Sequence, residues 1–326
     1  MKAVMKLVAT AAVGIMATVG AAQAQQVTFR SSDTHPADYP TVQAVEFMSE
    51  ILKKETDGRL SIQVFHSGQL GEERDTVQQT QFGVIDMLRV NLALLNNIAP
   101  ITRVPGLPFL FRSEEHMYKV MDGEIGQEIM KALEPHGLVG LAYYDSGTRN
   151  FYNSRRPVRT LEDMKGLKIR VQQSDLFIDT MRALGANPTP MPFGEVYSGL
   201  QTGVIDGAEN NWPSYHSTRH FEVSKYYSLS GHTMAPEILV MSKRSWDKLS
   251  AEDQELVRKA AQESVAKMRE LWKEREAQSR EAVIAAGAEI HEVDMDAFMK
   301  AVEPVYAKHV TDPQMQDMVE RIRAVQ

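Results

Sequence analysis

Residues 78–91 read QQTQFGVIDMLRVN, and residues 200–211 read LQTGVIDGAENN. In both stretches a helical pattern ends at a glycine, the four residues GVID follow, and polar side chains come shortly afterwards. Glycine commonly ends helices because it adopts the left-handed backbone conformation found there. The apolar pair that follows predicts a short strand beginning at Val84 and at Val204. Two copies with matched flanks predict two lobes of the same α/β design.

The segments before the first copy alternate between strand and helix patterns. Strands are predicted at Val27–Ser31, Leu60–Phe65 and Val84–Val90, and helices at Thr41–Leu52 and in the segment that ends at Phe82. This alternation is typical of a parallel sheet with helices on both faces. Ligands of such sheets bind beyond the carboxyl ends of the strands. The polar residues that fall there are Arg89 and Asn91 in the first copy and Glu209, Asn210 and Asn211 in the second.

The second lobe is predicted to begin near Ser154, and residues 166–171, GLKIRV, form its first strand. Apolar side chains alternate along this strand, so Arg170 shares the opposite face with Lys168 and Gln172. An inner strand of a covered sheet normally has apolar side chains on both faces. A buried arginine without an anion costs several kcal/mol, so Arg170 needs either an internal acid or a ligand.

A second arginine, Arg149, follows the predicted strand LVGLAYY. Two guanidinium groups at neighbouring strand ends suit a carboxylate, because each offers a planar pair of donors to two oxygens. For most other arginines of the chain a surface ion pair is the simpler interpretation.

The chain begins with a segment typical of a secretory signal peptide, residues 1–24. Lys2 and Lys6 precede an apolar run without charge, and Ala22-Gln23-Ala24 resembles a cleavage site. The run is short for a membrane anchor. We therefore expect a periplasmic protein whose mature chain does not insert into the membrane. Since it has no cysteine, it uses no disulfides.

The composition and motifs argue against several classes of function. The formal net charge is −7, and loss of a leader with two lysines makes the chain more acidic, which disfavours nucleic-acid binding. HExxH, G-x-S-x-G, P-loop and strand-linked G-x-G-x-x-G motifs are absent from the sequence. His216 and His220 have helical spacing without an acid between them, so we expect no metal site. We expect no cofactor and no enzymatic activity.

The segment from Ser250 to Ala286 contains neither glycine nor proline. Ser250 and Asp253 form a helix-start pattern. The segment is either two helices with a kink or one helix of roughly 50 Å that crosses behind both lobes, and we favour the single helix. We expect lobe I to contain residues 27–150 and 236–275, and lobe II residues 151–235 and 276–326. Several crossings would join them in a hinged clamshell.

Three segments resemble the solute-binding proteins of TRAP transporters, the tripartite ATP-independent periplasmic systems. They are GLKIRV, PTPMPFGEVYSGLQTGVIDGAEN and LSAEDQELV, and the resemblance extends from Val27 to beyond Val305. It implies a two-lobed periplasmic binding protein of type II-like fold with a long helix across the hinge. It also implies an organic-acid ligand and membrane permease subunits as partners.

The resemblance further implies roles for individual residues. Arg170 corresponds to the arginine that clamps the ligand carboxylate, and Arg149 to the arginine of the family's GTR element. Asn210 corresponds to the asparagine that follows the GVID-like element. Phe193 corresponds to the phenylalanine that covers the bound ligand, and the acid after QLG corresponds to Glu73 or its neighbour Glu72.

The side chains expected near the ligand include many partners for hydroxyl groups. They are His35, Glu73, Asn91, Gln173, Asn210 and Asn211, with Arg89 as a further candidate. One carboxylate with several hydroxyls describes a sugar acid. The doublet in AENNWPSY, with SSDTHPADYP and QLGEERDT, also resembles members of the family that bind hexuronates such as D-glucuronate and D-galacturonate.

Several alternatives stay open from the sequence. The ligand could be a C4-dicarboxylate, an aldonate or sialic acid, and the rival class is a secreted sugar-acid lyase or isomerase. Trp212 could stack on a sugar ring or pack beside Pro213. The sequence does not distinguish the epimers of a hexuronate, and it does not establish the oligomeric state.

Overall fold

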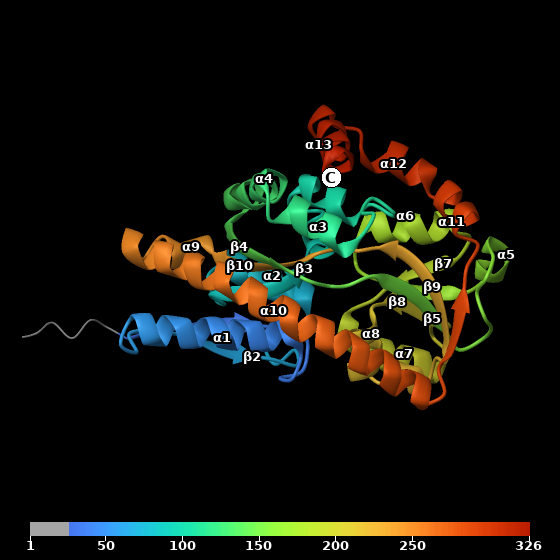
Figure 1. The fold of residues 1–326 in the computed structure, drawn as a ribbon, viewed down its shortest axis with the longest axis horizontal. Helices are drawn as coiled ribbons and strands as arrows, with labels where there is room; N and C mark the ends of the chain where they lie inside the picture. Colours follow the sequence, from blue (N-terminus) through green and yellow to red (C-terminus); the bar gives the residue numbers. More distant parts are fainter. Residues whose placement is uncertain (1–25) are drawn as a thin grey trace, which may run out of the picture.

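Two mixed β-sheets, each with its own helices, form the two lobes seen in the computed structural model (Figure 1). The structure describes residues 26–326, so the predicted signal peptide, residues 1–24, lies outside the described residues. Within residues 26–326, no helix has both the length and the apolar character needed to cross a membrane.

The first sheet has the strand order β2-β1-β3-β10-β4. Its strands are β1 (Val27–Ser32), β2 (Leu60–Phe65), β3 (Met87–Asn91), β4 (Leu138–Tyr144) and β10 (Glu237–Ser242). Its helices are α1 (Pro40–Glu55), α2 (Glu73–Gln81), α3 (Glu114–Met121), α4 (Glu124–Leu133) and α9 (Lys243–Trp246). The βαβαβ unit is confirmed, with β1 parallel to β2 and β3. The sheet is not all parallel, because β10 lies antiparallel between β3 and β4.

The second sheet has the order β11-β9-β5-β8-β6-β7. Its strands are β5 (Arg149–Asn153), β6 (Lys168–Val171), β7 (Asn187–Pro190), β8 (Gly207–Asn210), β9 (Tyr226–Thr233) and β11 (Glu289–Glu292). Its helices are α5 (Leu161–Met164), α6 (Asp175–Ala183), α7 (Val196–Thr202) and α8 (Trp212–Ser217). The proline-rich segment NPTPMPF, residues 187–193, contains β7, which tolerates two prolines because it is the edge strand.

The predicted strand starts in the GVID copies are wrong by three residues. Val84 and Val204 are exposed, and the strands begin at Met87 and Gly207. The repeat itself has a structural basis in its aspartates. The Asp86 carboxylate accepts a hydrogen bond from the Arg30 backbone, and the Asp206 carboxylate accepts one from the Lys168 backbone, each at 2.9 Å. Each aspartate therefore fastens its strand to the neighbouring parallel strand of its own lobe.

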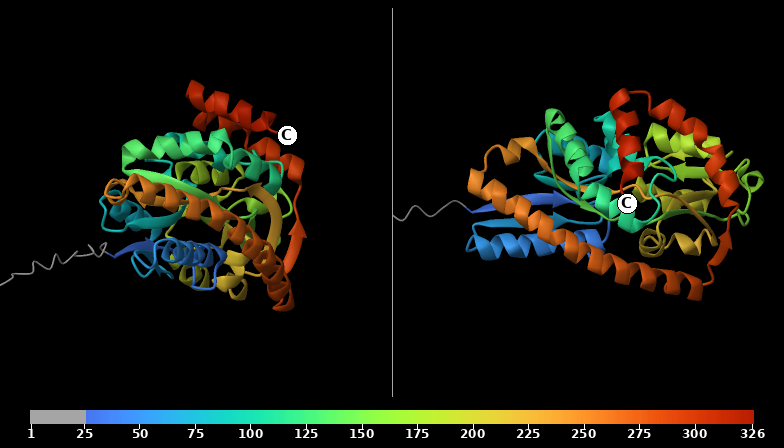
Figure 2. Two further views of the ribbon diagram at one scale, coloured as in Figure 1. Left: turned by 60° about the vertical axis from the view of Figure 1, so that its left-hand side comes forward. Right: turned by 45° about the horizontal axis from the view of Figure 1, so that its top comes forward.

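Three crossings connect the lobes. The chain passes from β4 to β5, returns from β9 to β10, and crosses again along α10 (Ala251–Ala285). The last element is one helix of 35 residues, about 50 Å long, so the single-helix prediction is confirmed. It packs on α1 and β4 in the first lobe and on α8 in the second, and it runs diagonally across both lobes (Figures 1 and 2).

The chain ends with α11 (Met295–Ala301), α12 (Glu303–His309) and α13 (Pro313–Ala324). These helices touch both lobes. His309 Nε2 lies 2.8 Å from Asp179 of α6, whereas His116 Nε2 of α3 lies 2.9 Å from the carbonyl oxygen of Ile322. α13 packs on helices of the first lobe, although the sequence predicts that residues 276–326 belong to lobe II. The assignment of α13 to lobe II therefore stays a prediction.

Candidate ligand-binding site

A cavity lined by residues of both lobes lies between them, with about 320 Å³ of space free of protein atoms, part of it open to solvent. Parallel strands end at this edge and antiparallel strands begin there, so residues from both kinds of strand meet at one place. The first lobe contributes Thr34, His35, Glu73, Arg89, Asn91 and Glu237. The second lobe contributes Arg149, Arg170, Gln172, Phe193, Asn210, Asn211 and Ser214.

All the predicted site residues line this cavity except Gln173. Gln173 lines a smaller adjoining recess together with Glu72, whereas its neighbour Gln172 lines the main cavity. Gln172 could have been chosen from the sequence, because it shares a strand face with Arg170.

Thr34, Ser214 and Glu237 were also missed. Glu237 begins the strand EILVMS and is followed by four apolar residues, so it is a charged residue in an apolar strand, which is the same signal that identified Arg170. Nothing in the local pattern distinguishes Thr34 or Ser214 from other loop hydroxyls.

Arg170 is buried on β6 and has very few partners. Its side chain is 4% exposed, and its Nε donates to the backbone oxygen of Met191 at 2.9 Å. It makes no ion pair with any carboxylate of residues 26–326. Its Cζ lies 5.9 Å from the ring centre of Phe193, whose ring covers it. Burial lowers the pKa of Arg170, because the charged form lacks a close counter-ion.

Arg149, in contrast, is fully engaged by its own lobe. Its Nε and Nη2 donate to the two carboxylate oxygens of Glu209 at 2.5 and 2.9 Å, and its Nη1 donates to Asn210 Oδ1 at 3.0 Å. Burial alone would raise the pKa of Glu209, but the charge of Arg149, together with hydrogen bonds from His232 and Arg149, outweighs burial and holds it at about 2. Arg149 thus lines the cavity as half of an internal ion pair.

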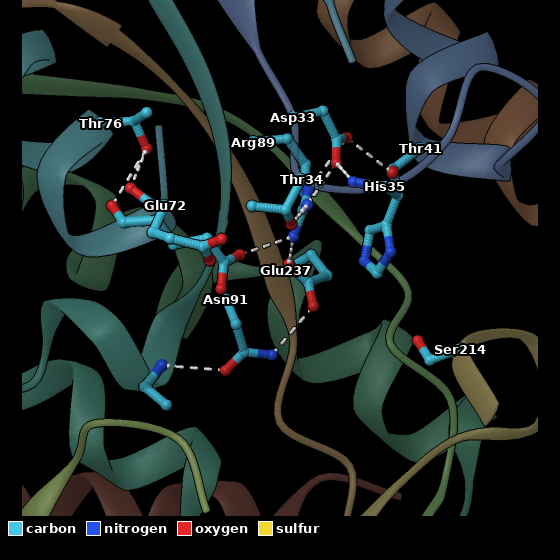
Figure 3. A network of polar contacts seen from close by, with 12 residues as sticks. Asp33, Thr34, His35, Thr41, Glu72, Thr76, Arg89, Asn91, Ser214 and Glu237 are labelled. Carbon is cyan, nitrogen blue, oxygen red and sulfur yellow. Dashed lines mark hydrogen bonds and ion pairs between the residues drawn. The ribbon is translucent and has the colours of Figure 1, made fainter. Parts of the chain in front are cut away.

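Arg89 lies at the centre of a dense network in the first lobe (Figure 3). Its guanidinium donates to both carboxylate oxygens of Asp33, to Glu237 at 2.7 Å and to Glu73 at 3.0 Å. Nη2 also donates to the Thr34 hydroxyl at 2.8 Å. One cation is therefore shared by three carboxylates, and we call these four charged groups the Arg89 cluster.

The Arg89 cluster has more carboxylates than cations, and this affects the pKa of Glu73. Burial raises the pKa of Glu73 to about 7, and the nearby carboxylates of Glu237 and Asp33 work in the same direction against the charge of Arg89. Oε1 of Glu73 accepts from Arg89, whereas Oε2 accepts no hydrogen bond within the described chain. Glu73 therefore presents a free acceptor to the cavity.

Two further polar groups face the cavity without partners. His35 Nδ1 and Gln172 Oε1 are buried and make no hydrogen bond within residues 26–326. Burial, followed by the charge of Arg89, lowers the pKa of His35 to about 3, so its ring is neutral at pH 7. The ring is stacked on Tyr39, with 3.8 Å between ring centres. A neutral imidazole and a carboxamide oxygen suit hydroxyl groups rather than a second anion.

Two asparagines of the site hold other protein groups in place, and a third has a donor left for a ligand. Asn91 donates to Glu237 and to a backbone oxygen, and Asn211 caps α8 by accepting from Ser214 N. Asn210 has its Oδ1 occupied, but its Nδ2 donates no hydrogen bond within the described chain. Trp212 stacks on Tyr227 at 3.8 Å between ring centres and does not line the cavity, so it packs in the core.

Contacts between the lobes close the cavity. The hydroxyls of Tyr39 and Ser214 share a hydrogen bond of 2.9 Å, and the Gly194 backbone donates to Glu72 at 3.3 Å. The rings of His35 and Phe193 meet edge to face at 5.3 Å. Within residues 26–326, no group of three or more histidines and acids is placed to hold a metal ion.

Two lobes closed over a polar cavity, with three crossings between them, define a bilobal solute-binding protein. Residues 31–312 match the family model described as bacterial extracellular solute-binding protein, family 7 (DctP). The chain belongs to this family.

Relatives of known sequence or structure are also solute-binding proteins. A solute-binding protein of Chromohalobacter salexigens is 39% identical, with 98% of this chain and 96% of the relative covered. A TRAP periplasmic solute-binding protein from Xanthobacter autotrophicus Py2, solved with bound β-D-galacturonate, is 55% identical, with a TM-score of 0.90 over 91% of this chain and 100% of that one. One from Pseudomonas putida F1, with bound D-glucuronate, is 44% identical, with a TM-score of 0.90 over 92% and 98%.

Proposed function

We propose that this chain is the periplasmic solute-binding subunit of a TRAP transporter, and that it captures a hexuronate such as D-galacturonate or D-glucuronate. The observation that carries the proposal is Arg170, a buried cation that has no ion-pair partner within residues 26–326 and that lines the cavity between the lobes. A ligand carboxylate supplies the missing charge through a bidentate contact. The closed protein then delivers the ligand to membrane permease subunits.

The rest of the cavity supports a sugar acid rather than a simple acid. Free acceptors and donors remain on Glu73, His35, Gln172 and Asn210, and they match hydroxyl groups around a ring. The ligands of the Xanthobacter and Pseudomonas proteins have this chemistry. A C4-dicarboxylate would leave most of these groups unpaired in a closed cavity, which is costly.

A thermal-shift screen tests the ligand class. Hexuronates, aldonates, sialic acid and C4-dicarboxylates are added separately to the purified mature chain. At about 100 times Kd a ligand adds about 2.7 kcal/mol to the free energy of unfolding. We expect the largest rise in Tm with a hexuronate. A response to succinate alone would overturn the sugar-acid assignment.

A second experiment separates binding from catalysis. Every charged group in the cavity except Arg170 has an internal ion-pair partner or lies in the Arg89 cluster, which suits a fixed binding surface. Incubation with galacturonate, followed by NMR, should leave the sugar unchanged. Appearance of a lyase or isomerase product would contradict the proposal.

A further inference from the structure

The two lobes contribute different charges to the cavity. Arg170 and the Arg149–Glu209 pair lie in the second lobe, where Arg170 is the cation without a close counter-ion in the described chain. The Arg89 cluster lies in the first lobe, where three carboxylates share one guanidinium. The second lobe therefore contributes a cation without a close counter-ion, and the first lobe contributes an excess of negative charge that includes Glu73, which also faces Arg170.

We propose that the Arg89 cluster makes the site reject sugar acids with a carboxylate at both ends, and that Glu73 is the residue that enforces this rejection. The inference rests on the proposed function, because it assumes that one carboxylate of the ligand engages Arg170. It restricts the substrate class to monocarboxylates such as uronates and excludes the corresponding aldarates.

The contacts of the cluster show why Glu73 has this role. Asp33 uses both carboxylate oxygens on Arg89, and Glu237 divides its oxygens between Arg89 and Asn91. Glu73 lines the cavity and accepts from Arg89 through Oε1 alone, so Oε2 is left as a free acceptor within the described residues. A hydroxyl donates to that oxygen favourably, whereas a second carboxylate offers no proton and adds repulsion.

Once one carboxylate of the ligand occupies Arg170, no other cation lining the cavity is free to relieve this repulsion. Arg89 already contacts three acids, and Arg149 is bidentate with Glu209. An arginine held in this way has few donors left for a second carboxylate. Discrimination here comes from an unfavourable contact with the wrong ligand as much as from good contacts with the right one.

Protonation of Glu73 should weaken the rejection. The charged groups that face Glu73 are Arg89 from β3, Glu237 from β10, Asp33 from the loop after β1, and Arg170 from β6. Burial, opposed by Arg89 and reinforced by the two acids, raises the pKa of Glu73 to about 7. Near pH 6 the protonated carboxyl can donate to a second carboxylate, which itself stays ionised there.

Calorimetry with a matched pair of ligands tests the inference. D-Galacturonate has one carboxylate and closes to a ring, whereas its aldarate, galactarate, has two carboxylates and stays open, so the pH dependence and the Glu73 variant isolate the effect of charge. At pH 8, we expect the wild type to bind galacturonate on the order of 100-fold more tightly than galactarate. Between pH 8 and pH 6 the galactarate affinity should rise by up to about tenfold per pH unit, and the galacturonate affinity should change much less.

Two variants separate the role of Glu73 from a general effect of charge. Glu73→Gln keeps an oxygen for Arg89 and turns an amide donor toward the cavity, so galactarate should gain affinity and the pH dependence should disappear. Asp75→Asn is the control, since it removes one negative charge from the exposed face of the same helix. We expect it to preserve the wild-type preference.

The outcomes are distinguishable. Equal affinity of the wild type for both acids at pH 8 would overturn this inference and leave the proposed function intact. An unchanged preference in Glu73→Gln would overturn the role of Glu73. Binding of neither acid by the wild type would overturn the proposed function and this inference together.

Discussion

Arg89 and Arg170 are both buried arginines on inner strands of the two lobes, and they line the same cavity. Arg89 contacts three carboxylates, whereas Arg170 makes no ion pair within residues 26–326. A buried charge costs several kcal/mol unless it is paired. The comparison indicates that Arg89 holds the protein together, whereas Arg170 is completed by the ligand.

The largest expected effect separates these roles in the ligand-free protein. Arg89→Met leaves three carboxylates buried without their cation, so the free energy of unfolding at pH 7 should fall by about 3–5 kcal/mol. Arg170→Met removes a cation that has no ion-pair partner within residues 26–326 and one hydrogen bond to a backbone oxygen, so its free energy of unfolding should lie within about 1 kcal/mol of the wild type, or above it. Urea unfolding of both variants measures the difference. Equal losses would show that both arginines are structural.

The Arg149–Glu209 pair extends the comparison to pH. The folded pKa of Glu209 is lowered to about 2 from an ordinary value of 4.5, so its stabilising contribution is present above pH 4.5 and is lost as the pH falls toward 2. Glu209→Gln should lower the free energy of unfolding by about 2–3 kcal/mol at pH 7. The difference from wild type should shrink below pH 4.5. If urea unfolding gives the same difference in free energy between Glu209→Gln and the wild type at pH 3, 5 and 7, the lowered pKa of Glu209 is contradicted.

The contribution of Glu73 to stability should change with pH in the opposite direction to that of Glu209. Its folded pKa is raised to about 7, so its contribution is most favourable below pH 4.5 and is lost as the pH rises through 7. At pH 8, Glu73→Gln should be more stable than the wild type by about 1–2 kcal/mol, because one pKa unit corresponds to about 1.4 kcal/mol. At pH 4 the two proteins should have similar stability. A destabilised variant at pH 8 would show that the Arg89 cluster has no surplus of negative charge.

The smallest effect concerns the closure of the lobes. Tyr39→Phe removes the hydroxyl that shares a hydrogen bond with Ser214 across the cavity rim. Because one neutral hydrogen bond contributes about 1 kcal/mol, ligand affinity should fall by about fivefold. The stacking of the ring on His35 should remain. Calorimetry with galacturonate measures the loss, and an unchanged affinity would show that this contact does not help closure.

Much of the fold was predictable because it depends on local patterns. Alternating apolar residues identified β2 and β6, and the segment without glycine or proline between Ser250 and Ala286 identified α10. The strand starts at Met87 and Gly207 were missed because the aspartates of the GVID copies bind a neighbouring strand, which is a contact distant in sequence. The antiparallel place of β10 between β3 and β4 is equally non-local.

Most of the residues that line the cavity could be predicted from the sequence, but the pairing of their charges could not. A polar residue at the end of an apolar strand indicates a position near the cavity, and this signal found Arg89, Arg149 and Arg170 alike. Which arginine is paired depends on Asp33, Glu209 and Glu237, whose side chains meet the arginines only after folding. Periodicity along one strand cannot show such pairing.

The central claim is that Arg170 is reserved for the ligand carboxylate. Titration calorimetry of the wild type and Arg170→Met, with galacturonate and with its uncharged methyl ester, tests it most directly. We predict that the substitution weakens galacturonate binding by about 100-fold or more, since truncating one side of a buried charge pair costs at least about 2–5 kcal/mol, and that the ester binds both proteins with similar weak affinity. Galacturonate affinity within about threefold of the wild type in Arg170→Met, or an equal loss for the ester, would contradict the claim.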